Sequence, residues 1–150
     1  MIILLVVGSC GVKKVKFVLD PKLENDSSFI CDLTLTQVRL SHNAAFAWII
    51  LIPRLPNMVE LIDLSVSEQE QLLKEIRLAS HIMRTLFQPT KLNVANLGNV
   101  VSQLHIHVIA RFNTDLAWPQ PVWNSGVHQE YMNSEKQQRI SLLVNAFMEP

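Results

Sequence analysis

The stretch that decides the fold is Q-L-H-I-H-V-I-A-R-F, residues 103–112. Every second position in it is apolar, and these positions are Leu104, Ile106, Val108, Ala110 and Phe112. The intervening positions are polar except for Ile109, and they are Gln103, His105, His107 and Arg111. A period of two is typical of a half-buried β-strand. We therefore predict a strand over residues 103–112 that packs one face on a core and presents two imidazoles on the other, about 7 Å apart along the backbone.

Three interpretations of the histidine pair compete. The polar face of the strand could simply meet solvent. The imidazoles could share a metal ion, since neutral histidines two apart on a strand can both be ligands. That site needs a third ligand, and the other histidines and the cysteines have no metal-binding spacing; they are His42, His81, His128, Cys10 and Cys31. Finally, one histidine could be a nucleophile and the other a phosphate contact or proton carrier.

The composition describes one globular domain. The chain has 150 residues, of which 49% are hydrophobic and 17% charged, enough for a core and too apolar for a disordered segment. Its 13 basic and 13 acidic residues cancel, so no basic field indicates binding to nucleic acid or to an anionic membrane. Two widely spaced cysteines form no disulfide framework, which favours a reducing, cytoplasmic setting.

The remaining pattern predicts an antiparallel sheet with helices, an α+β fold. Residues 48–52 are continuously apolar and end at Pro53, as expected of a central buried strand. Further strands are predicted at 37–40 and 91–97, the second leading through a Gly98–Asn99 turn into the histidine strand. Residues before 37 suggest only loops, a short helical turn and mixed polarity.

Two helices are predicted after the central strand. Ser65 and Ser67 each open a capping box, and a long apolar stripe follows until Pro89. We expect Glu75 to face water from this helix. A second amphipathic helix opens at Ser134 and ends the chain.

Residues 1–16 differ from the rest of the chain. An apolar run is followed by Gly, Ser and Cys and then by three lysines, and it is too short to span a bilayer. We expect an accessory segment here and a single domain over 17–150. The segment could be an added strand, a packing or dimer element, or the product of an upstream start codon.

The run N-V-V-S-Q-L-H-I-H-V-I-A-R, residues 99–111, resembles the histidine-triad motif His-φ-His-φ-His-φ-φ, where φ is apolar. Gln103 takes the first place, His105 the middle and His107 the third. A-W-I-I-L-I-P-R at 47–54 is similar to the family's strand that ends in Pro-Lys or Pro-Arg, and Trp118-Pro119 to a Trp-Pro after the motif. The resemblance spans residues 17–123 and is closest to the diadenosine tetraphosphate hydrolase-like branch.

The resemblance implies a fold and a reaction. The fold would be the histidine-triad antiparallel sheet with one long central helix and a C-terminal helix, usually a homodimer. His105 would attack the α-phosphate of a nucleotide derivative, such as a dinucleoside polyphosphate or a nucleoside phosphoramidate. Water would then hydrolyse the covalent nucleotidyl-histidine. His107 would contact the phosphate oxygens and help to carry a proton, with no metal or cofactor required. Further substrate contacts implied by the resemblance are Asn43, Gly98, Asn99, Gln103 and Trp118.

The chain also departs from the family pattern. Gln103 cannot titrate as a histidine would. The histidine that often follows the Pro-Lys or Pro-Arg strand end is missing, and a hydroxyl residue before the motif is replaced by Val100 unless the alignment shifts to Ser102. Two alternatives therefore stand beside the hydrolase: a nucleotide-binding module with little turnover, and a metal-dependent enzyme that uses the pair of histidines.

Overall fold

The computed structural model describes residues 16–149, so residues 1–15 of the expected accessory segment lie outside the described part. Five strands, three α-helices and a short 3-10 helix follow one another there. In chain order they are α1 (Pro21–Asn25), β1 (Ser27–Asp32), β2 (Thr36–Ser41), β3 (Ala47–Pro53), η1 (Leu61–Asp63), α2 (Val66–Phe87), β4 (Lys91–Ala95), β5 (Ile106–Arg111) and α3 (Asn133–Met148). Within residues 16–149 no helix is both long enough and apolar enough to cross a membrane.

The strands form one antiparallel sheet in the order β1-β2-β3-β5-β4. The apolar run predicted as a central strand is β3, which lies in the middle of the sheet. It pairs with β5 so that Ile50 stands opposite His107 and Trp48 opposite Ile109. The α+β class and the antiparallel sheet are confirmed, and this pairing brings the central strand beside the histidines.

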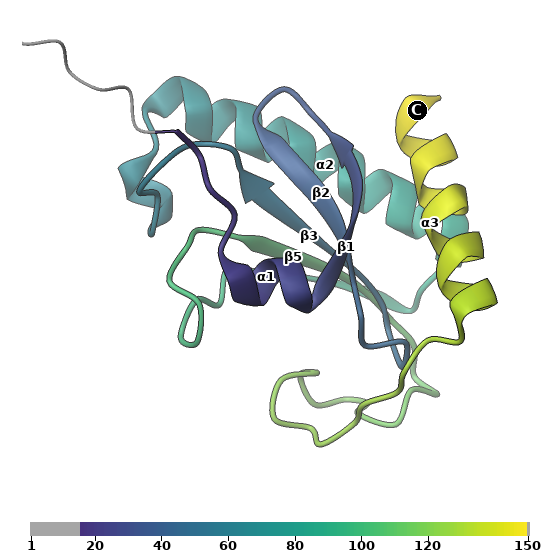
Figure 1. Cartoon of the computed structure of the whole chain (residues 1–150). Coiled ribbons are helices and arrows are strands. Elements are labelled where there is room, and N and C mark those ends of the chain that lie inside the picture. Colours follow the sequence, from purple (N-terminus) through teal and green to yellow (C-terminus); the bar gives the residue numbers. More distant parts are fainter. Residues whose placement is uncertain (1–15, 150) are drawn as a thin grey trace, which may run out of the picture.

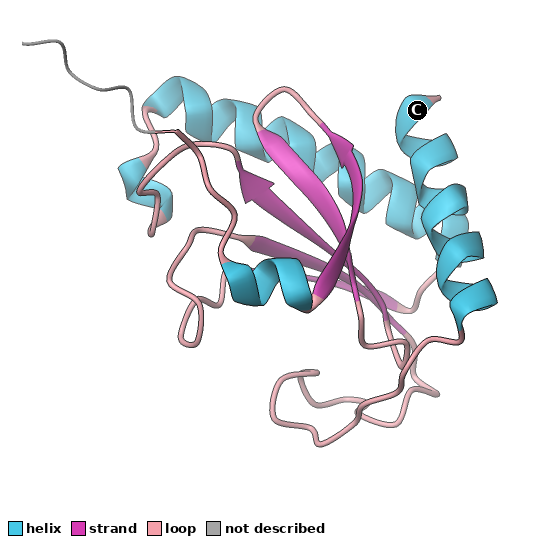
Figure 2. Ribbon diagram, in the orientation of Figure 1, coloured by secondary structure: helices cyan, strands magenta, loops and turns pink. Residues whose placement is uncertain are grey.

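The helices cover the two faces of the sheet unequally. Helices α2 and α3 share the large core with the sheet, whereas the short α1 lies on the opposite face (Figures 1 and 2). The alternate apolar positions of the histidine stretch, Leu104, Ile106, Val108 and Ala110, belong to the large core. Their burial leaves His105 and His107 for the other face, as a strand period of two requires.

Helix α2 begins and ends where its sequence signals predict. Ser65 accepts a hydrogen bond from the Glu68 amide, and the Glu68 carboxylate accepts one from the Ser65 amide. The helix ends at Phe87, and the capping residue Gln88 takes the left-handed conformation just before Pro89. The expectation for Glu75 is wrong. Its carboxylate is buried and accepts hydrogen bonds from Leu35 N, Thr36 N and Thr36 Oγ1, so it anchors the β1–β2 turn to the helix.

Three predicted boundaries are also corrected. Strand β5 begins at Ile106 and not at residue 103, and β4 ends at Ala95, so ten residues at 96–105 form an open loop and not a tight turn. Strand β1 occupies 27–32, where the sequence suggested mainly a loop. All six residues of β5 are buried, so the alternative in which the polar face of this strand simply meets solvent is wrong.

Candidate active site

Two imidazoles stand where the polypeptide enters β5. His105 directly precedes the strand, and His107 is its second residue. Their ring centroids are 4.8 Å apart, and the ring planes meet at 87°. Both side chains line a cavity of about 560 Å³, yet they are only 4% and 5% exposed. A cavity of this volume is ordinary for a small-molecule site.

The backbone determines which nitrogen of His105 carries the proton. Nδ1 of His105 lies 2.6 Å from the carbonyl oxygen of Gln103. A carbonyl can only accept, so Nδ1 holds the hydrogen of the neutral ring. Nε2 has no partner among residues 16–149 and keeps its lone pair. His105 is thereby held in the tautomer that a nucleophile needs.

His107 has the opposite arrangement. The indole Nε1–H of Trp48 donates to Nδ1 of His107 at 3.0 Å. An indole can only donate, so Nδ1 is unprotonated and the neutral ring carries its hydrogen on Nε2. Burial, and after it the charge of His105, lowers the pKa of His107 to about 3. At neutral pH His107 is therefore an uncharged hydrogen-bond donor.

Two tryptophans that were not among the predicted site residues line the cavity beside His107. The ring of His107 packs edge-on against Trp48 and Trp123, with centroids 5.3 and 5.1 Å away, and both tryptophans line the cavity. Trp48 lies in the apolar run of β3, and only the pairing of β3 with β5 shows that it reaches the histidines. Trp123 lies in the long loop after β5, where no periodicity marks it.

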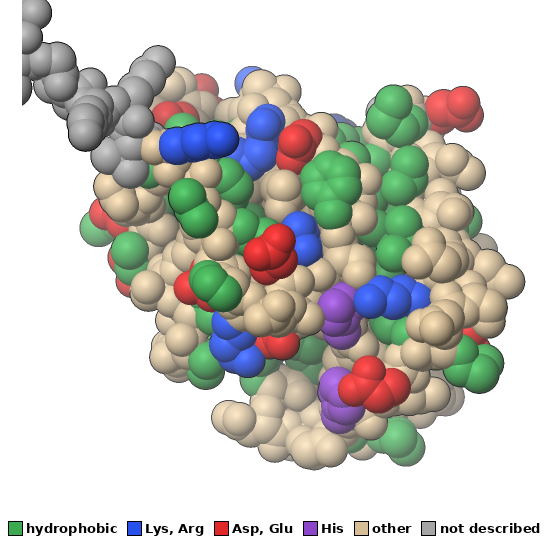
Figure 3. All heavy atoms as spheres, in the orientation of Figure 1, with side chains coloured by type: hydrophobic (Ala, Val, Ile, Leu, Met, Phe, Trp, Pro, Cys, Tyr) green, Lys and Arg blue, Asp and Glu red, His purple; other side chains and the backbone are tan. Residues whose placement is uncertain are grey.

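The rim of the cavity carries charges that are largely paired. Lys22 forms an ion pair with Asp26 at 2.8 Å, and His128 lies 2.8 Å from Glu130. His42 accepts a hydrogen bond from Lys136; burial, followed by the positive charge of Lys136, lowers its pKa. Figure 3 shows acidic, basic and histidine side chains intermixed on this side of the molecule. The entrance therefore has no strong field of either sign.

Gln103 does not line this cavity. Its Oε1 accepts from the amide of Asp20, and its Nε2 donates to the carbonyl of Val18, both at 2.9 Å. The side chain thus holds the segment before α1 to the loop before β5. It faces a separate hollow, and its two polar atoms are already used.

Asn43 lines the cavity, but its amide is also engaged. Oδ1 accepts from the amides of Ala45 and Gln129, and Nδ2 donates to the carbonyl of Val127. These bonds fasten the loop before α3 to the end of β2. The contact that the resemblance implied with a ribose would have to compete with them.

The other predicted contacts divide between the cavity and its surroundings. Asn99 is among the lining residues, whereas Gly98 and Trp118 are not. A Cβ on Gly98 would lie 3.1 Å from the carbonyl oxygen of Val101, so the residue allows a close backbone approach. Trp118 packs over the guanidinium of Arg111, 5.9 Å from its ring centroid. Trp123, five residues later, occupies the position at the cavity that Trp118 was expected to fill.

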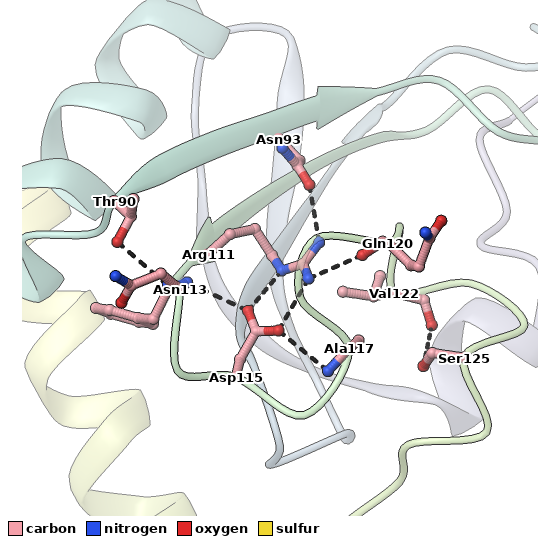
Figure 4. Close-up of polar contacts among 10 residues, drawn as sticks. Thr90, Asn93, Arg111, Asn113, Asp115, Ala117, Gln120, Val122 and Ser125 are labelled. Carbon is pink, nitrogen blue, oxygen red and sulfur yellow. Dashed lines mark hydrogen bonds and ion pairs between the residues drawn. The ribbon is translucent and has the colours of Figure 1, made fainter.

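A buried ion pair organises the loop that carries these tryptophans. Arg111, at the end of β5, donates through Nε and Nη2 to both carboxylate oxygens of Asp115 at 2.8 and 2.9 Å. It also donates to Asn93 Oδ1 on β4 and to the carbonyl of Gln120 (Figure 4). Asp115 accepts the amides of Phe112 and Ala117 as well. The bonds from Arg111 to Asp115 and to the Gln120 carbonyl close the loop back onto the sheet.

A metal ion shared by the two histidines would need a third protein ligand. Within residues 16–149 no group of three or more histidine, cysteine, aspartate or glutamate side chains is arranged to hold an ion. The residues at the cavity thus provide an imidazole with a free nitrogen lone pair, an uncharged donor and two aromatic walls.

Comparison with known proteins gives this arrangement a family. A family model described as the HIT domain matches residues 22–114, more than half of the chain. The chain belongs to the HIT domain family. It shares 39% identity with a histidine triad protein of Bradyrhizobium japonicum over 88% of this chain and 98% of that one, with a TM-score of 0.85. No match to the chain was found among curated proteins.

Two further solved structures agree with the HIT assignment. A histidine triad protein of Marinobacter aquaeolei is 33% identical over 90% of this chain and 98% of that one, with a TM-score of 0.86. A third from Sinorhizobium meliloti is 34% identical over 87% and 96%, with a TM-score of 0.83. Because each of these structures covers 87–90% of the chain, the similarity extends beyond the residues that the family model matches.

Proposed function

We propose that this HIT protein is a nucleotide hydrolase or nucleotidyl transferase that acts at the α-phosphate of a nucleotide derivative. The observation that supports it best is the pair of opposite tautomers. Nε2 of His105 keeps a free lone pair, and Nε2 of His107, on a ring 4.8 Å away, carries a hydrogen. A nucleophile beside an uncharged donor suits attack on a phosphoryl group whose oxygens need hydrogen bonds.

The reaction would proceed in two displacements. His105 Nε2 attacks the α-phosphorus, a P–N bond forms, and the bond from phosphorus to the leaving group breaks. The leaving group departs with the bond electrons and takes a proton from solvent, and solvent recovers a proton from the attacking water in the second step. Water then attacks the phosphorus, the P–N bond breaks, and the mononucleotide leaves. His107 Nε2–H donates to a phosphoryl oxygen in both steps, and Nδ1–H of His105 stays on the Gln103 carbonyl.

The substrate class follows the diadenosine tetraphosphate hydrolase-like branch, with a dinucleoside polyphosphate or a nucleoside phosphoramidate as candidates. The charge of the cavity bears on this choice. Lys22 is the only lysine or arginine among its lining residues in the described part of the chain, and it is paired with Asp26. A substrate with one charge at the reacting phosphate needs less neutralisation than a polyphosphate. We further propose that the protein acts in the cytoplasm and as a homodimer.

A nucleotide-binding module with little turnover is the second candidate, and a specific observation favours it. His107 is held neutral, and Gln103 points out of the cavity, so neither stands ready to protonate a leaving group. A site of this kind would turn over only substrates whose leaving group departs without a strong acid.

The test is hydrolysis of adenosine phosphoramidate and diadenosine tetraphosphate, each with and without a chelator. We expect His105→Ala to abolish turnover, because alanine offers no nucleophile. His107→Ala should slow it about 10²-fold, the usual effect of losing one positioned donor. Mass spectrometry of acid-quenched enzyme should detect a nucleotidyl adduct on His105. His81→Ala, an exposed change on α2 that does not line the cavity, is the control.

Each outcome separates the candidates. Turnover by the His105→Ala variant would contradict the nucleophile. Activity that disappears with the chelator would favour the metal-dependent enzyme. Binding of nucleotide with no turnover of either substrate would favour the binding module.

A further inference from the structure

Trp48 differs from the other described residues of the cavity because its side chain donates a hydrogen bond to a candidate catalytic group, His107. The bond joins indole Nε1 to His107 Nδ1 at 3.0 Å. Trp48 stands on β3 and His107 on β5, and the two strands pair directly. A side chain on the central strand of the sheet therefore determines the proton position on the histidine.

We propose that Trp48 is a positioning residue whose indole N–H locks His107 in the Nε2–H tautomer, so that the histidine donates a hydrogen bond to the substrate phosphate and does not carry a proton. A second hydrogen on Nδ1 would face the indole N–H directly. Trp48 thereby excludes both the other neutral tautomer and the imidazolium. The role of His107 as a phosphate contact rests on the proposed function, whereas the tautomer itself does not.

The surroundings of His107 favour the same state. Its cross-strand partners are Ile50 on β3 and Ala95 on β4, and its aromatic neighbours are Trp48 and Trp123. None of these is charged. Among residues 16–149, His105 is the one titratable group packed against the ring, and a charge there would oppose a second charge on His107. The low pKa of His107 agrees with this environment.

The position of Nε2 of His107 indicates what the fixed tautomer contributes to the site. Among residues 16–149 nothing accepts a hydrogen bond from Nε2 of His107, although the residue lines the cavity. A polar hydrogen left without a partner beside a cavity is available to an acceptor on a ligand. His105 Nε2, its neighbour, is an acceptor. The two rings thus present one donor and one nucleophile to the same phosphoryl group without exchanging roles.

The experiment separates the N–H group from the shape of the indole. Trp48 is replaced by 3-benzothienylalanine, an isostere whose sulfur cannot donate, and in parallel Trp48→Phe is made. Trp123→Phe is the matched control, because Trp123 also packs edge-on against His107 but forms no hydrogen bond with it. Long-range ¹H–¹⁵N spectra of ¹⁵N-histidine-labelled protein then report the tautomer and protonation of His107 from about pH 5 to 8.

We expect the wild-type chain and Trp123→Phe to show only the Nε2–H tautomer across this range. The isostere and Trp48→Phe should show a mixture of tautomers and a raised pKa for His107. With an active substrate, both Trp48 variants should lose kcat about tenfold with little change in KM, the usual effect of weakening one neutral hydrogen bond. A tautomer and a pH profile unchanged in the isostere would overturn the proposal. The spectra test the tautomer of His107 even if no substrate is turned over. Failure of the proposed function can therefore be told apart from failure of this proposal.

Discussion

Burial of His107 links the stability of the fold to pH. The pKa of His107 is about 3 in the folded chain, against about 6.5 for a histidine in an unfolded one. Between these values the unfolded state binds a proton that the folded state does not, so the free energy of unfolding falls as the pH falls. The contribution is on the order of 5 kcal/mol. It is fully present above about pH 6.5 and is lost progressively toward pH 3.

Urea unfolding at about pH 7 and pH 5 measures this effect, because carboxylates stay largely ionised between the two. We expect the free energy of unfolding to fall less between them for His107→Gln than for wild type. The slope, which is the fall in the free energy of unfolding from pH 7 to pH 5, should not vanish in this variant, because the pKa of His42 is lowered as well. His81→Ala, an exposed change on α2, should keep the wild-type slope. Equal slopes for His107→Gln and wild type would show that the residue is protonated in the fold.

Gln103 illustrates what a motif comparison cannot show about one residue. The motif places it where the family has a histidine, and a substrate contact is the natural expectation. Its amide is instead used by the chain itself, on Val18 and Asp20. Those partners are distant in sequence and have no pattern, so the direction of this side chain could not be predicted from the stretch alone.

Among the elements, those with a strong local signal were the ones predicted well. The apolar run of β3, the capping box of α2 and the alternation that leads into β5 each point to one structure. Strand β1 lacks such a signal because it is an edge strand whose burial varies along its length. The loop at 96–105 was taken for a turn because Gly and Asn suit turns. Glu75 was placed in water because its bonds go to a turn forty residues away.

The turn after β5 is the element whose loss we expect to matter most. Asp115→Asn would leave the buried guanidinium of Arg111 without a carboxylate, and breaking such a pair costs on the order of 3 kcal/mol. The Arg111 hydrogen bond is the main cause that holds the pKa of Asp115 below its ordinary value. This stabilisation is present above about pH 4 and is lost as the pH falls through the lower folded pKa.

Urea unfolding at neutral and acidic pH checks the prediction. Asp115→Asn should lower the free energy of unfolding at pH 7 and flatten its decrease below about pH 4. Glu70→Gln, which alters an exposed carboxylate on α2, should leave both unchanged. An Asp115→Asn variant as stable as wild type at pH 7 would mean that the charge of Asp115 contributes nothing to the free energy of unfolding.

For the whole molecule, the two edges of the sheet bear on how chains associate. Strands β1 and β4 stand at the two ends of the sheet order, and an uncovered edge invites pairing with another chain. Phe17 packs against Leu23, Ile50 and their neighbours, so it belongs to the domain. We therefore keep the proposal of an accessory segment over 1–16 and a domain over 17–150.

Light scattering of the full chain and of a chain that lacks residues 1–16 tests both proposals. We expect twice the mass of one chain in each case at micromolar concentration, and equal activity. A monomeric full chain would contradict the dimer. A dimer that is lost only on deletion would place residues 1–16 in its interface.

The position of the tryptophans gives the protein an optical reporter of its own. Two of its three indoles, Trp48 and Trp123, stand 5.8 Å apart in the wall of the cavity, while Trp118 lies over Arg111 outside it. A nucleotide base or phosphate that enters the cavity must change the polarity around both indoles. Intrinsic fluorescence should therefore follow ligand entry without any label, and Trp118→Phe should remove most of the emission that does not respond.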